Sequence, residues 1–347
     1  MTEQPRVTVV IPAYRAERTI RRAVDSALAQ EGVDLQVVAV VDGRLDRTAE
    51  LLAGYDTDRL TVVVNEENQG SQISRNKGLA VAEGEFVMFL DCDDFLEGPL
   101  LSGLSERLRE QGADIAFGPM QVMYEETGRR RPTILRDYRS TDDLVRAWLA
   151  EGKTMAPCSI LWRTEFLRAI GGWNERIKRN QDGEVVMRTI FSGARFALSA
   201  EGRGVYVNHN SPHRITRRPE NLASSLDVGE ALLAMDSPTV SESAKREGLS
   251  GYFYRIALRL SAFGRPDLGE RAFAKARELG HPAPARYRYL ARLLGVPARA
   301  GIFGLDKTAF VSRVHLGLTA LLIRWATPKL SEQRGGAVAG DGAAAAA

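Results

Sequence analysis

The chain has 347 residues, of which 44% are hydrophobic and 26% charged, with a formal net charge of +3. This length suits one large domain with a smaller second one. Cys92 and Cys158 are too few for a disulfide framework and lack metal-site spacing, so we expect a reducing compartment. The sequence shows neither a signal segment nor a run of eighteen apolar residues, so we expect a cytoplasmic protein without a membrane span.

The first 90 residues predict alternating strands and helices. Apolar runs predict strands, and apolar residues three and four positions apart predict helices. The expected strands are 7–11, 35–41, 60–64 and 85–90, and the expected helices are 17–30, 48–53 and 71–82. Strands that alternate with helices form right-handed crossover units. We therefore predict an α/β fold with a mostly parallel central sheet, followed by a helical C-terminal region.

Three carboxylates, Asp91, Asp93 and Asp94, follow the fourth expected strand directly. Ligands of open α/β sheets bind at the carboxyl ends of the strands, so the acids are expected where a ligand would lie. Carboxylates this close repel one another unless a cation lies between them, and oxygen ligands suit Mg²⁺ or Mn²⁺. A solvated turn that caps the next helix is the alternative interpretation.

Loops after the other strands, and the helix that follows the third loop, carry groups that suit a nucleotide. The ring of Tyr14 can stack on a base, Asp42 can accept a base N–H, and Arg75 can hold a phosphate. Packing, a turn and a solvated helix face are the respective alternatives. Since the chain has neither a P-loop nor a dinucleotide-binding fingerprint, phosphates here would need a metal.

Four motifs follow one another in this region, at 7–14, 40–46, 68–78 and 83–94. Their order and spacing resemble those of family 2 glycosyltransferases with the GT-A fold, over about residues 5–215. The resemblance implies inverting, metal-dependent transfer of a sugar from a nucleotide sugar, by preference a UDP-sugar. The acceptor would be a hydroxyl of a glycan or lipid-linked molecule in polysaccharide or glycoconjugate biosynthesis. The enzyme would be a hexosyl- or N-acetylhexosaminyl-transferase.

The resemblance also implies donor-binding roles for individual residues. Pro12, Ala13, Tyr14 and Asp42 match residues that hold the nucleotide base, and Arg75 matches an arginine near the nucleotide.

The acids match the DXD region, which binds the ribose and the divalent metal on the diphosphate. Asp93 is expected on the ribose or the metal and Asp94 on the metal, while Asp91 with Asp93 also fits that motif. The sequence leaves open which pair coordinates. His209 matches a histidine near the active site and is expected to contact the diphosphate or metal, with an exposed loop histidine as the alternative.

Asp182 matches the general base of inverting members, which removes the proton of the acceptor hydroxyl. The alternative interpretation is the N-cap of a helix over 183–191, and one aspartate can fill both roles. The chain departs from the family where Val41 and Arg44 replace an acid and a serine, which leaves the identity of the base open. Arg44 reaches either a phosphate or solvent.

Three domains are expected: a catalytic domain over 1–220, a helical domain over 221–330 and a disordered tail over 331–347. The expected C-terminal helices are 226–235, 241–263, 268–279 and 285–294. An amphipathic helix at 308–325 either makes a peripheral contact with the inner face of the plasma membrane or docks on its own domain. No nucleic-acid partner is expected, and the oligomeric state is left open.

Two other functions would use parts of the same pattern. A sugar nucleotidyltransferase shares the nucleotide-binding sheet but opens with a Gly-rich, basic phosphate loop, which residues 12–15 do not form. A non-catalytic nucleotide- or glycan-binding module would not need the acids at Asp42, Asp93, Asp94 and Asp182.

Overall fold

The computed structural model describes residues 3–209, 223–262 and 265–281. The chain divides into two compact units, 1–252 and 253–347. The domain boundary expected at residue 220 lies outside the described residues, as do the expected helices at 285–294 and 308–325 and the C-terminal tail, so these stay predictions. Within the described ranges, no helix has both the length and the apolar character needed to cross a membrane.

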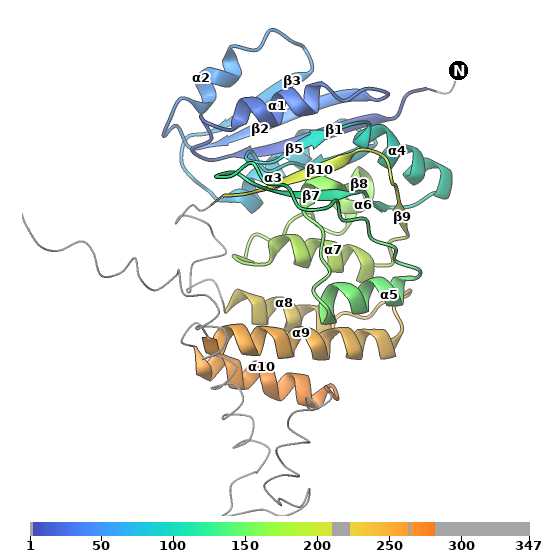
Figure 1. Ribbon diagram of the computed structural model, residues 1–347. Coiled ribbons are helices and arrows are strands. Elements are labelled where there is room, and N and C mark those ends of the chain that lie inside the picture. The colour runs from blue at the N-terminus through green and yellow to red at the C-terminus, as the bar shows by residue number, and fades with distance from the viewer. Residues whose placement is uncertain (1–2, 210–222, 263–264, 282–347) are drawn as a thin grey trace, which may run out of the picture. The chain divides into compact units, whose positions relative to one another are not determined.

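A seven-stranded sheet forms the centre of the first unit, in the order β3-β2-β1-β4-β8-β6-β9 (Figure 1). Neighbouring strands are parallel except at β8, which runs antiparallel to both β4 and β6. The strands are β1 Arg6–Ala13, β2 Asp34–Asp42, β3 Leu60–Asn65, β4 Phe86–Phe89, β6 Ile115–Phe117, β8 Ile160–Arg163 and β9 Phe196–Leu198. This arrangement confirms the predicted α/β fold with a mostly parallel sheet.

A second sheet has three strands in the order β5-β10-β7. Its strands are β5 Phe95–Glu97, β7 Met120–Tyr124 and β10 Arg203–Asn208. β5 begins directly after the acids that follow β4, and β10 runs antiparallel to it. The C-terminal end of β10 therefore lies beside those acids.

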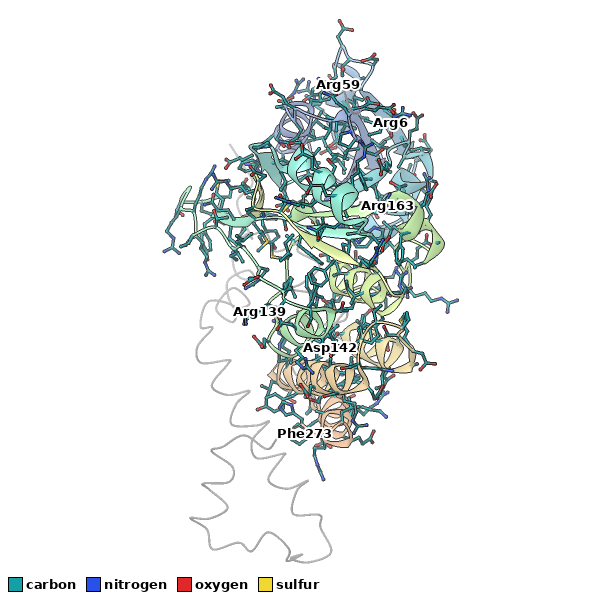
Figure 2. The ribbon with its side chains drawn as sticks, turned by 90° about the vertical axis from the view of Figure 1, so that its right-hand side faces the viewer. Arg6, Arg59, Arg139, Asp142, Arg163 and Phe273 are labelled. Carbon is teal, nitrogen blue, oxygen red and sulfur yellow. The ribbon has the colours of Figure 1, made fainter. Side chains whose placement is uncertain are left out.

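The helices are α1 Ile20–Leu28, α2 Thr48–Ala53, α3 Ser71–Val81, α4 Leu100–Gln111, α5 Thr141–Val145, α6 Thr164–Ala169, α7 Gln181–Phe191, α8 Ser224–Ala234, α9 Glu242–Ala262 and α10 Pro266–Glu278. Of these, α1, α2, α3, α4 and α6 contact strands of the central sheet, and α7 contacts α8 (Figure 1). A π-helical turn, Arg146–Ala150, continues α5, and a 3₁₀ turn, Pro157–Ser159, precedes β8. Asp142 of α5, labelled in Figure 2, accepts a 2.8 Å hydrogen bond from the backbone N–H of Ser241, just before α9.

The elements predicted between residues 7 and 90 are all present, with bounds that differ by at most three residues. The expected helices at 226–235, 241–263 and 268–279 correspond to α8, α9 and α10. One local expectation is wrong. α7 begins at Gln181 and its N-cap is Asn180, so Asp182 lies within the first turn instead of capping the helix.

Close packing of α3 on the sheet depends on Gly78. A Cβ atom at this position would lie 2.2 Å from Cγ1 of Val10 in β1. The helix can approach the strand this closely only because glycine has no side chain. Arg75 stands one turn earlier on α3 and is 4% exposed. The approach of α3 thus buries this guanidinium at the carboxyl ends of the strands.

Candidate active site

The carboxyl ends of β1, β2 and β4 lie together at one edge of the central sheet. Ala13 pairs with Val41 in register, which places the β1 end beside Asp42. The backbone N–H of Leu90 donates to the carbonyl of Val10 at 2.9 Å, which brings the acids after β4 to the same edge. Of the predicted base-binding residues, Pro12 and Ala13 are buried, whereas Tyr14 is 44% exposed and open to a ligand.

Asp42 is 2% exposed and holds the loop that follows β3. Its Oδ1 accepts hydrogen bonds from Asn65 Nδ2 at 3.0 Å and from the backbone N–H of Gln69 at 2.8 Å. Its Oδ2 accepts from the backbone N–H of Gly70 at 2.8 Å. Both carboxylate oxygens therefore have protein partners. A nucleotide base that contacted Asp42 would have to share these oxygens with the protein.

Asp94 is the most deeply buried of the three clustered acids, at 1% exposure. Its Oδ1 accepts a 2.8 Å hydrogen bond from the backbone N–H of Val207 in β10, whereas its buried Oδ2 has no hydrogen-bond partner among the residues that the structure describes. Burial, together with repulsion from Asp93 and Asp91, raises the pKa of Asp94 well above its usual value. A cation beside Oδ2 would give this oxygen a partner and would supply a positive charge that offsets the repulsion among the three carboxylates.

The three acids have different partners although one oxygen of each lies within 4.8 Å of the others. Arg75 Nη2 pairs with Asp91 Oδ1 at 2.6 Å. His209 Nε2 lies 2.6 Å from Asp93 Oδ2. His209 therefore contacts the cluster but is not one of its three acids. Asp94 accepts from the backbone N–H of Val207 and contacts the Cys158 thiol. Among the described residues, Asp91 is thus paired with an arginine, whereas Asp93 and Asp94 are not.

Arg75 connects this cluster with the start of α7. Its Nη1 donates to Gln181 Oε1 at 3.1 Å, and Asp182 Oδ1 lies 4.0 Å from Nη2. The guanidinium also stacks over the ring of Trp173, 4.3 Å from the centroid. The buried Arg75 guanidinium is thus surrounded by four groups, which form ion pairs, a hydrogen bond and a cation–π contact with it. They are Asp91, Trp173, Gln181 and Asp182.

Asp182 keeps 44% of its side-chain surface exposed, so an acceptor can reach its carboxylate. Surrounding protein atoms displace water and, with repulsion from Asp91, raise the pKa of Asp182 to about 6, although Arg75 opposes the shift. The exposed surface limits how far this pKa can rise. Glu184, by contrast, is buried and pairs with Arg188 at 2.7 Å, so it is not directed to the site.

The structure brings the predicted site residues to one edge of the sheet and adds two that sequence reasoning had not assigned. Trp173 and Gln181 contact Arg75, but no local sequence pattern ties either residue to α3. Arg44 forms an exposed ion pair with Glu66 at 3.3 Å, in agreement with its solvent interpretation.

Comparison with known sequences identifies one family. Residues 8–171 match the model of "Glycosyl transferase family 2". The succinoglycan biosynthesis protein ExoO of Rhizobium meliloti is 39% identical over 119 residues, which cover 34% of each chain. Glycosyltransferase GlyA of Streptococcus pneumoniae is 27% identical over 214 residues, which cover 60% of this chain and 28% of GlyA. The chain thus spans about a third of the length of these two relatives.

Solved structures show the same fold at lower identity. TarS 1–349 of S. aureus in complex with UDP superposes with a TM-score of 0.58 at 20% identity, over 86% of this chain and 94% of that one. Mannosyltransferase PcManGT from Pyrobaculum calidifontis, in complex with GDP-Man and Mn²⁺, gives a TM-score of 0.55 at 18% identity, over 94% and 89%. Asp182 lies beyond the 8–171 segment, so its role does not follow from the family match.

Proposed function

This chain belongs to glycosyltransferase family 2, with the GT-A fold, and we propose that it transfers a sugar from a nucleoside diphosphate sugar to an acceptor hydroxyl with inversion. The observation that carries this proposal is the edge of the sheet where Arg75 joins two carboxylates. Asp91 belongs to the cluster of three acids, and Asp182 Oδ1 lies 4.0 Å from the same Arg75 nitrogen that pairs with Asp91. A donor site and an acceptor base would therefore adjoin each other.

Asp93 and Asp94 are the residues we propose as holding a divalent cation, Mn²⁺ or Mg²⁺. Their donors are oxygens, as hard cations prefer, and Asp94 Oδ2 is buried with no partner in the described part of the chain. Asp91 is already paired with Arg75, and His209 would orient Asp93 through its 2.6 Å contact. Such a cation, when bound, would neutralise the diphosphate that leaves. The complex of PcManGT with GDP-Man and Mn²⁺ supports this part of the proposal.

The nucleotide base would lie at the β1 and β2 ends, where Tyr14 is exposed beside the buried Pro12 and Ala13. Asp42 would either contact the base or act only by holding the 65–70 loop. A UDP-sugar is the favoured donor, because TarS has been crystallised with both UDP and UDP-GlcNAc. The transferred group would be a hexose or an N-acetylhexosamine.

Asp182 would act as the general base. The acceptor oxygen forms a bond to the anomeric carbon on the face opposite the diphosphate, the bond to the diphosphate oxygen breaks, and the hydroxyl proton passes to the Asp182 carboxylate. Its 44% exposure leaves room for an acceptor. We propose a glycan or lipid-linked hydroxyl as acceptor, in line with the polysaccharide named for ExoO. A cytoplasmic location, with 308–325 at the membrane surface, belongs to the same proposal.

Turnover of donors tests this function. Purified protein is incubated with UDP-glucose, UDP-GlcNAc and GDP-mannose, with Mn²⁺ or with a chelator, and the nucleoside diphosphate released when the sugar is transferred to water is measured. We expect release from at least one donor only with metal. Asp182→Ala should lower the rate by about 10²–10⁴-fold, and Asp94→Ala should remove the metal dependence together with most of the activity.

Glu83→Gln is the matched control, because Glu83 is an exposed acid whose 2.5 Å ion pair with Arg6 lies on the surface. It should retain full activity. Full activity of Asp94→Ala or Asp182→Ala would contradict the proposal. Formation of pyrophosphate from UTP and a sugar phosphate would instead indicate a nucleotidyltransferase, and nucleotide binding without any turnover would indicate a binding module.

A further inference from the structure

Tyr252, in the middle of α9, contacts the segment that carries the proposed base. The side chain is 6% exposed. Its hydroxyl donates to the backbone carbonyl of Ser225 at 2.7 Å and accepts from Asn180 Nδ2 at 3.2 Å. Since the first bond uses the hydroxyl proton, the oxygen is left with lone pairs for the Asn180 amide. Tyr252 thereby joins the start of α7 to α8.

Asn180 has an unusual backbone conformation that determines how α7 begins. It is the helix N-cap, with φ 59° and ψ 34°, in the left-handed region. Asparagine tolerates this region better than most residues, but the conformation still needs support from its surroundings. The side chain of Asn180 folds over Gly183, where an added Cβ would lie 2.4 Å from Asn180 Oδ1. Asn180 can therefore take this position only above a glycine.

The residues before Asn180 are held from two further elements. The side-chain amide of Gln72, on α3, donates to the carbonyl of Ile177. The hydroxyl of Ser224, at the start of α8, accepts a 2.9 Å hydrogen bond from the backbone N–H of Lys178. α3, α8 and α9 together thus hold the segment 177–180, and Asp182 follows two residues later.

We propose that Tyr252 is a positioning residue for Asp182, acting through Asn180. This inference rests on the proposed function, in which Asp182 is the general base. Because Asn180 sets the direction in which α7 starts, loss of its contact with Tyr252 would let Asp182 move away from Arg75 and the acceptor. Displacements of about 1 Å at a reacting group can lower rates strongly. The helices beyond the 8–171 family segment would then be part of the catalytic apparatus.

Two substitutions separate positioning from general stability. Tyr252→Phe removes only the hydroxyl, and Asn180→Gly keeps the left-handed backbone but removes the amide. Each should lower kcat about three- to ten-fold while KM for the donor changes less than about two-fold. The double variant should be no slower than the slower single variant, because both substitutions remove the same hydrogen bond between Tyr252 and Asn180. Turnover is measured with Mn²⁺ and whichever of UDP-glucose, UDP-GlcNAc and GDP-mannose the wild type uses.

Amide hydrogen exchange provides a readout that does not depend on turnover. Residues 181–184 should exchange faster in Tyr252→Phe than in the wild type. Tyr55→Phe is the control, since this hydroxyl bonds Asp25 on α1 at 2.6 Å and contacts none of the proposed site residues. It should leave both kcat and this exchange unchanged.

The outcomes distinguish this inference from the function on which it rests. Unchanged kcat or unchanged exchange in Tyr252→Phe would overturn the inference alone, as would additive losses in the double variant. An equal loss of kcat in Tyr55→Phe would also overturn it, because the effect would then be one of general stability. Absence of wild-type turnover with every donor would refute the proposed function, and the positioning role with it.

Discussion

Replacement of Arg75 by methionine should destabilise the first unit more than the loss of any surface ion pair. Methionine keeps an unbranched apolar stem but removes the guanidinium that pairs with Asp91 at 2.6 Å and stacks on Trp173 at 4.3 Å. Removal of one partner from a buried pair costs about 3–5 kcal/mol. The side chains of Asp91 and Asp182 keep 31% and 44% exposure, so water can solvate them after the loss. We therefore expect the lower end, about 3 kcal/mol.

Urea unfolding of wild type and Arg75→Met at pH 7 measures this loss. Arg6→Met is the control, because its ion pair with Glu83 joins side chains that are 50% and 58% exposed, and such pairs contribute about 0–1 kcal/mol. Figure 2 labels Arg6. Equal losses in the two variants, or a loss below about 1 kcal/mol in Arg75→Met, would refute the view that Arg75 holds the site together.

Three further predictions concern the site and its supports. The rate at saturating donor should rise as the pH rises through about 6. The reason is that Asp182 accepts a proton only when it is ionised, and its pKa is raised to about 6. A rate that is flat from about pH 5 to 8 would contradict the role of Asp182 as base. Asp42→Asn should cost about 1.5–3 kcal/mol in urea unfolding, because the carboxylate accepts from the backbone of Gln69 and Gly70, and an unchanged midpoint would argue against this support. Gly84→Ala should cost about 1–3 kcal/mol, since its Cβ would lie 2.5 Å from the Thr8 nitrogen, and unchanged thermal unfolding would show that the strand can shift.

Much of the fold could be predicted from the sequence, because its signals are local. The buried residues of α1 are Ile20, Ala23, Val24 and Ala27, which is the helical spacing on which the prediction rests. The strand over 34–42 is a continuous buried run from residue 37 onward, as expected for the interior of a parallel sheet. Elements that depend on such short-range periodicity need no knowledge of their neighbours.

The start of α7 shows where local reasoning fails. Asp182 has the residue type of an N-cap and precedes an apolar pattern, yet the helix begins at Gln181 and Asn180 caps it. Asn180 takes a left-handed conformation that is supported by Tyr252, 72 residues away, and by the space above Gly183. The residue pattern of the helix gives no indication of these contacts, so the sequence does not predict where the first turn begins.

Residue types and strand order indicate which side chains could take part in chemistry and at which edge of the sheet they meet, because the carboxyl ends of parallel strands share one edge. Asp42 and the acids at 91–94 were placed in this way. Tertiary packing sets the partners, which are Arg75 for Asp91 and His209 for Asp93, and it leaves Asp94 Oδ2 buried with no partner among the described residues. Charge pairing and burial depend on distances of a few ångströms between segments far apart in the chain, and only the packed protein sets those distances.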